Sequence, residues 1–343
     1  MTFRLSALIV CALGFCAWSS PAWAGDFLFQ WDNDKVADTD RHYTNGMRIG
    51  YVPDDMWAPF QSSTDFLVAW LGFGGFGDIA PAQRADGWVF GQDMYTPEDV
   101  LSYTPDPNDR PYAGWTYVGL TSLAQTQNAS LGMDQQDTLE VDIGIVGPEA
   151  RAGETQNWFH RQINVAESNG WNSQIGTEPG LLITRTVKLR SQTWDDWNDW
   201  GLGVDAIPHA TGQLGNIKIG ASAGLTFRFG QNLREDFGPI YGTFAIPRQA
   251  PKSFVWAFYA GAEGRAVVRD IFLDGNTLKD SPDVDRNPFV LESRFGLVGH
   301  VPVPEGWGLK GARMDLSHVI RSREFRSQDK IDRYGSFKLI LNF

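Results

Sequence analysis

The sequence predicts an all-β protein: a closed antiparallel transmembrane β-barrel of about twelve strands, preceded by a cleaved N-terminal signal peptide. Three observations support this prediction. Residues 1–24 have the pattern of an export signal, many short segments alternate apolar and polar residues, and the chain ends in an aromatic strand. No linker, internal repeat or change in composition divides residues 25–343, so we expect them to form a single barrel domain.

The N-terminal segment has the three parts of a secretory signal. Arg4 provides the positive charge, residues 5–17 form an apolar run, and residues 22–24 (Ala-Trp-Ala) match a small-x-small cleavage site. The apolar run is shorter than the roughly 20 residues that a spanning helix needs, which makes a retained anchor helix the weaker alternative. Both cysteines, Cys11 and Cys16, lie here, so we expect the mature chain to lack disulfides, thiolate metal sites and cysteine nucleophiles.

The last strand shows the alternation most clearly. Its alternate positions are apolar: Phe337, Leu339, Leu341 and Phe343. Lys338 and Asn342 fall on the other face, as expected for a strand between lipid and a polar lumen. A soluble sandwich strand could share this pattern, but an aromatic last residue is typical of outer-membrane barrels. We therefore expect the protein in the bacterial outer membrane, with outer-membrane lipids around it.

Similar alternation recurs over residues 43–51, 139–145 and 217–229. Charges at alternate positions of otherwise apolar strands fit a polar lumen better than a dry core. About twelve such segments begin near Asp26, Tyr43, Trp88, Ala113, Thr138, Leu181, Gly201, Asn216, Ser253, Phe289, Gly308 and Arg333. An even number suits a closed barrel, because closure leaves no unpaired edge. Residues 156–166 have crude helical spacing and are expected to form a short helix.

The acidic balance limits the partners. The formal net charge is −12, and it becomes −13 once Arg4 leaves with the signal. We expect no nucleic-acid partner, because phosphates require a basic face. Binding of an anionic lipid to this acidic protein would need local basic residues or a bridging divalent cation.

A G-x-S-x-G pattern occurs at residues 220–224. A nucleophile elbow needs a strand, a sharp turn and a helix around the serine. Here the pattern lies within unbroken strand alternation, so we reject a catalytic role for Ser222.

The segment that joins the first two predicted strands concentrates oxygen ligands. These are Asn33, Asp34, Asp38, Asp40 and Thr44. Hard cations such as calcium prefer several carboxylate, amide and carbonyl oxygens. The segment therefore offers a candidate cation site, and a solvated polar hairpin loop is the alternative.

One histidine stands in a suggestive context. His160 lies in the run Gln156-Asn157-Trp158-Phe159-His160-Arg161 and is followed by Glu167. A nearby carboxylate or cation can tune an imidazole for general acid–base work near neutral pH. A hydrogen-bonded structural histidine is the alternative.

Together these segments resemble the lipid A 3′-O-deacylase family of outer-membrane barrels. The matching pieces are Asn33-Asp34, residues 40–46 (DRHYTNG), 91–97 (GQDMYTP), 109–114 (DRPYAG), 144–148 (GIVGP) and 156–161 (QNWFHR). Their order and approximate spacing also match. The resemblance covers about the first half of the mature chain. No single piece is specific, but the set is.

The resemblance implies a calcium-dependent esterase in a twelve-stranded barrel. It implies His160 as the base that activates water, with Gln156, Glu167 and Asp34 as further catalytic residues. Asn33, Asp34 and Thr44 would lie near the metal and the oxyanion. The chain departs from the family in one place, because residues 98–109 contain no lysine or arginine for the lipid A phosphates, and Arg110 is the first basic residue afterwards.

The function expected from these observations is removal of the ester-linked 3′-acyloxyacyl chain of lipid A, within lipopolysaccharide, by a monomer. Water activated by His160 and a divalent cation would carry the reaction. Two alternatives remain open: a serine-type outer-membrane phospholipase, and a barrel without catalysis that serves as a small channel or structural protein.

Overall fold

The computed structural model describes residues 25–34, 42–55, 58–71, 84–128, 130–195, 200–241, 243, 251–304, 306 and 308–343. The expected signal peptide, residues 1–24, lies outside the described residues, as do Asp38 and Asp40. Within the described residues no helix is long and apolar enough to cross a membrane.

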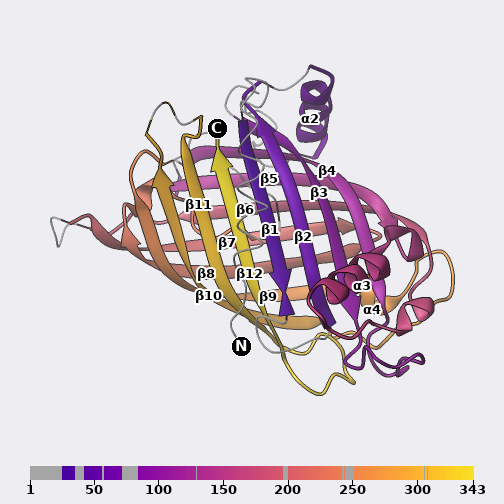
Figure 1. Cartoon of the computed structure of the whole chain (residues 1–343). Helices are drawn as coiled ribbons and strands as arrows, with labels where there is room; N and C mark the ends of the chain where they lie inside the picture. Colours follow the sequence, from indigo (N-terminus) through magenta and orange to yellow (C-terminus); the bar gives the residue numbers. More distant parts are fainter. Residues whose placement is uncertain are drawn as a thin grey trace.

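The described residues form a closed barrel of twelve antiparallel strands, which confirms the predicted fold class (Figure 1). The strands are β1 (Gly25–Asn33), β2 (His42–Pro53), β3 (Arg84–Thr96), β4 (Ala113–Asn128), β5 (Met133–Val146), β6 (Glu178–Arg190), β7 (Leu202–Gly215), β8 (Lys218–Gln231), β9 (Val255–Asp270), β10 (Phe289–Pro302), β11 (Gly311–Arg321) and β12 (Asp332–Asn342). Each strand pairs with its sequence neighbours. The barrel closes between β1 and β12, where Phe27 faces Leu341 and Asn33 faces Gly335.

Short helices lie in the connections between strands. They are α2 (Ala58–Leu71), α3 (Ala152–Gln162) and α4 (Ile271–Asp274), with 3-10 turns η5 (Pro148–Ala150), η6 (Gly170–Ser173) and η7 (Leu233–Glu235). The helix expected over residues 156–166 is α3, which begins and ends four residues earlier. We call the end of the barrel where β1 begins and β12 ends the terminal end, and the other end the far end. Figure 1 shows α2 outside the barrel at the terminal end, and α3 and α4 at the far end.

Strand alternation sorts the side chains as predicted. Outward positions such as Val118, Ile143 and Phe227 are apolar and exposed. Inward positions carry many charges, and these pair with one another between neighbouring strands of the inner wall. Arg228, for example, is fully buried and binds Asp205 in a two-point contact.

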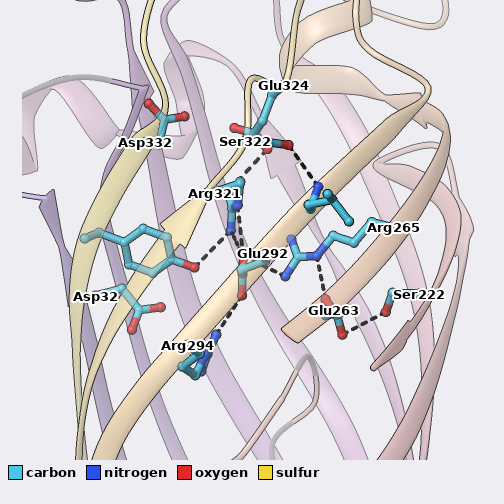
Figure 2. A network of polar contacts seen from close by, with 12 residues as sticks. Asp32, Ser222, Glu263, Arg265, Glu292, Arg294, Arg321, Ser322, Glu324 and Asp332 are labelled. Atoms are coloured by element: carbon cyan, nitrogen blue, oxygen red, sulfur yellow. Dashed lines mark hydrogen bonds and ion pairs between the residues drawn. The ribbon is translucent and has the colours of Figure 1, made fainter. Parts of the chain in front are cut away.

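A network of ion pairs centred on Glu292 joins neighbouring strands on the inner wall toward the far end (Figure 2). The Glu292 carboxylate contacts Arg265 at 2.9 Å, Arg321 at 2.9 Å and Arg294 at 3.2 Å. Arg321 also reaches Glu324 at 3.2 Å and donates to the Tyr334 hydroxyl at 2.9 Å. One carboxylate therefore joins the charges of strands β9, β10 and β11.

The segment after η7 folds into the lumen from the terminal end. Asp236 pairs with Arg228 and Arg313, and the carbonyl oxygens of Pro239 and Ile240 accept from Lys188 and Lys338. Burial alone would raise the pKa of the Asp236 carboxyl, but its two arginine partners outweigh burial and hold the pKa at about 2. Residues 236–241, which we call the luminal segment, are therefore fixed inside the barrel by cations from the wall.

We predict that Glu292→Gln destabilises the barrel. Its carboxylate offsets three guanidinium groups, and breaking a buried ion pair costs about 3–5 kcal/mol because a charge is left uncompensated. The free energy of unfolding in detergent, followed by the gel shift between folded and heated barrel, measures this loss. The control is Asp285→Asn, whose exposed pair with Arg326 spans 4.0 Å and should contribute little. Equal stability of both variants would contradict a structural role for the network.

Candidate functional site

The described residues of the predicted oxygen-rich segment, Asn33, Asp34 and Thr44, lie at the far end, where β1 ends and β2 begins. Asn33 pairs with Asn45 across the two strands, and Asp34 directly follows β1. The register between β2 and β3 shifts between Tyr43 and Asn45, which makes Thr44 the extra residue of a β-bulge. Bulges change the direction of side chains and are frequent beside active sites. The backbone thus brings Asn33, Asp34 and Thr44 together; the side chain of Thr44 lies outside the described residues.

The connection between β5 and β6 packs against the outer face of the wall. Gln92 and Thr116 have the outward parity of the exposed Phe90 and Val118, yet both donate to the carbonyl oxygen of Ala150, at 2.7 and 2.8 Å. A polar pair that would otherwise face outward is thereby covered and satisfied. The start of α3 is consequently fixed on the lipid side of the strands and not above the lumen.

Helix α3 approaches the wall closely because β4 offers a glycine there. A Cβ atom on Gly114 would lie 2.5 Å from the Cβ of Ala152, so a larger residue would push the helix away. Ala152, Gln156 and His160 recur every four residues and form the buried stripe of α3, whereas Trp158 is exposed. The stripe that faces the wall therefore carries two of the predicted site residues.

His160 is held in a defined tautomer. Its ring is 2% exposed, and Nδ1 lies 2.7 Å from the carbonyl oxygen of Ala166. A carbonyl can only accept, so Nδ1 carries the hydrogen and donates it. In the neutral ring Nε2 then holds the lone pair that a general base needs.

The Gln156 amide is oriented by Trp171 of η6. The indole Nε1 can only donate, so its partner at 2.7 Å is the amide oxygen Oε1. The amide nitrogen Nε2 is buried and has no hydrogen-bond partner among the described residues. Gln156 thus presents an unsatisfied pair of N–H donors, one helical turn from His160.

Aromatic packing holds Trp171 in place. Its ring lies 5.0 Å from that of Tyr112, and a Cβ atom on Gly153 would come within 2.8 Å of the indole. Neither Trp171 nor Tyr112 was predicted as a site residue from the sequence. Tyr112 lies in one of the matched motifs, and Trp171 beyond all of them.

The Glu167 carboxylate pairs with Arg161. The side chain of Glu167 is 45% exposed, and the ion pair spans 2.9 Å at the end of α3. Asn157 binds the backbone of Ser168 through both its amide atoms, at 2.8 and 3.1 Å, which folds the loop back onto the helix. Glu167 therefore lies in the same loop as Ala166, directly after it, and its carboxylate faces solvent.

The end of β1 lies beside α3. The rings of Trp31 and Phe159 are 6.5 Å apart, and Asn33 has the same outward parity as Trp31. Asn33 and Asp34 are 5% and 1% exposed. An amide oxygen and a buried carboxylate are hard donors that fit calcium, although no group of three or more His, Cys, Asp or Glu side chains gathers among the described residues.

Two other sequence features are not available for catalysis or phosphate binding. Ser222 lies within β8 and donates to Glu263 at 3.0 Å, while His209 contacts the same Glu263 oxygen at 3.1 Å. The carboxylate separates serine from histidine, so the rejection of Ser222 as a nucleophile agrees with the geometry. Arg110 is buried against Glu324 at 3.2 Å and cannot reach an external phosphate.

Comparison with known proteins identifies the family. The model of the family described as "Outer membrane protein LpxR" matches residues 6–343. The chain belongs to this LpxR family. Membership and the closed barrel together place it in the bacterial outer membrane and support a role in lipid A modification.

A solved structure of an LpxR protein agrees with this assignment at the level of the fold, and a second structure matches only weakly. The structure titled "LpxR from Salmonella typhimurium" is 22% identical, with a TM-score of 0.71 over 93% of this chain and 100% of that one. The β domain of the Bordetella autotransporter BrkA is 8% identical, with a TM-score of 0.40 over 93% and 98% of the two chains. No curated protein matches the sequence.

Proposed function

We propose that the protein hydrolyses the ester bond of the 3′-acyloxyacyl chain of lipid A, with His160 as the base. The observation that carries the proposal is the position of His160, which lies on the wall-facing stripe of α3, outside the lumen and at the far end. A lipid could reach this position sideways from its own leaflet. A soluble substrate would instead be expected to find its site in a lumen or an open cleft.

The orientation of the barrel suits a lipopolysaccharide substrate. An even number of strands puts both chain ends at one end of the barrel, and a protein that inserts from the periplasm keeps those ends on the periplasmic side. The far end then faces the outer leaflet, where lipopolysaccharide resides. His160, Gln156 and Asn33 would lie level with the junction of sugar and acyl chain.

The residues divide the chemistry between them. His160, with Nδ1 held by Ala166, would take a proton from water at Nε2 while that water attacks the ester carbonyl. When the bond between the acyl carbon and the 3′ oxygen of the sugar breaks, the protonated His160 would return this proton to the departing oxygen, releasing the free acid and the sugar hydroxyl. The N–H groups of Gln156 would donate to the carbonyl oxygen as it gains negative charge. Asn33, Asp34 and Thr44 would hold a calcium ion, which would supply positive charge beside the ester. For Glu167 we propose a supporting role, pairing with Arg161 to steady the loop that carries Ala166.

The alternatives have less support in the geometry. A serine phospholipase would need a serine bonded to a histidine, and Ser222 is bonded to Glu263. A channel would need an open lumen, and the luminal segment and the Glu292 network occupy it. One chain supplies all the proposed residues, which is compatible with a monomer. Mass spectrometry of lipid A and phospholipids from expressing cells tests the proposal: lipid A should lose the 3′-acyloxyacyl chain, and an intact lipid A would overturn it.

We expect His160→Asn to lower the rate of acyl release about 10²- to 10⁴-fold, the usual contribution of a general base, because an amide cannot accept the proton. The folded gel band should persist. Release of the acyl chain in detergent micelles, measured by mass spectrometry, checks the rate. A wild-type rate would remove His160 from the mechanism, and loss of the folded band would assign it a structural role.

Trp171→Phe should keep the aromatic packing but lose the N–H that orients Gln156. A net hydrogen bond of this kind is worth about 1 kcal/mol, so we expect kcat to fall about fivefold with little change in KM. The matched control is Trp158→Phe, on the exposed face of α3, the helix that carries Gln156. If both variants keep the wild-type kcat, Trp171 does not position the amide.

Chelation should abolish acyl release, and calcium should restore it. Asp34→Ala should raise the calcium concentration needed or eliminate turnover, because it removes the charged donor. Asp283→Ala, in an exposed loop, should leave the calcium requirement unchanged. The measurement is the rate against free calcium after dialysis, and full activity in excess chelator would refute a metal role.

A further inference from the structure

Helix α2 packs against the outside of the barrel with its polar side inward. Gln61 donates to Asp86 at 2.8 Å, and Asp65 forms an ion pair with Arg84. Thr64 and Val68 are its buried residues. The contact stripe therefore consists mainly of polar side chains at helical spacing, the reverse of a helix that packs on a soluble protein.

The wall beneath α2 explains this polar stripe. Arg84 and Asp86 have the outward parity of the exposed Trp88 and Phe90, and Ser122 of β4 donates to Asp86. An ion pair in these positions would face lipid if it were uncovered, at a cost that a barrel avoids. Gln61 and Asp65 give each member of this pair a further polar partner, so α2 shields a charged patch on the outer wall.

The exposed side of α2 is apolar. Phe66 and Trp70 stack at 6.5 Å and are 66% and 68% exposed, and Phe60 is 43% exposed. The neighbouring hydroxyls of Ser62 and Ser63 donate to backbone carbonyls of the helix itself, at 2.9 Å. The most exposed side chains of α2 thus carry no charge, and their hydroxyl donors are already satisfied; the carboxylate of Asp65, 41% exposed, is paired with Arg84.

We propose that the exposed side of α2 lies in phospholipid, in the leaflet at the terminal end of the barrel. An uncharged aromatic surface of this kind is unfavourable in water but suits the interfacial layer of a bilayer, where aromatic rings collect. It also continues the outward apolar surface of the barrel, since Trp88 follows Asp86 on the same face of β3. At 14 residues the helix lies along the membrane and does not cross it.

Single-cysteine variants provide the test, because both cysteines of the sequence, Cys11 and Cys16, precede residue 25. Phe66→Cys and Trp70→Cys in the chain from Gly25 onward would carry an environment-sensitive fluorophore, with the protein in phosphatidylcholine vesicles. Brominated acyl chains quench a fluorophore in lipid, and iodide quenches one in water. Val118→Cys on the outward wall is the lipid control, and Asp285→Cys, 82% exposed by side chain, is the water control.

The expected result is a loss of emission in brominated lipid at positions 66 and 70 as large as that at 118, without iodide quenching. Iodide quenching like that at 285 would overturn the proposal, because α2 would then lie in water. Protection from both quenchers would also overturn it, because a second copy of the chain would then cover the helix. Folding of each variant is checked by the gel shift, and Phe60→Cys replaces a variant that fails to fold.

Discussion

The hydrogen-bonding demand of the backbone in lipid is the constraint on which the rest of the structure depends. Lipid offers no partners, so the twelve strands must pair all the way around, and closure between β1 and β12 leaves no edge. Closure then divides side chains into an outward and an inward set, and any polar outward residue needs its own cover. Two such patches among the described residues are Arg84 and Asp86, which lie beneath α2, and Gln92 and Thr116, which lie beneath the turn that leads into α3.

Helix α2 and the connection that carries α3, which cover these two patches, differ in the side chains that they add to the outer wall. Helix α2 satisfies the polar groups beneath it and turns aromatic rings outward. The connection that carries α3 satisfies Gln92 and Thr116 but brings in polar groups of its own, including a buried histidine and the donors of Gln156. Inside the barrel, ion pairs satisfy the inward polar side chains, so the lumen is a polar core. The residues to which we assign the proposed catalysis therefore lie on the outer wall, beside the lipid.

The closed antiparallel barrel, its number of strands and the position of Asn33, Asp34 and Thr44 between the first two strands could be predicted from the sequence, because they depend on local alternation and on neighbouring strands. The bond between Trp171 and Gln156 could not, since it depends on the path of a loop that returns to its own helix. The structure also places Glu167 with Arg161, a pairing that sequence spacing alone does not reveal. The reversed polarity of α2 was hidden as well, because Gln61 and Asp65 pack inward only where the wall presents Arg84 and Asp86.

The charged patch under α2 has a consequence for how the protein is assembled. If the sheet entered the bilayer with Arg84 and Asp86 uncovered, this ion pair would be transferred into lipid, which cannot solvate it. Docking of α2 therefore belongs to the insertion step itself and cannot be a later adjustment. Because α2 lies in the connection between β2 and β3, the cover is synthesised just before the strand it protects and reaches the membrane together with it.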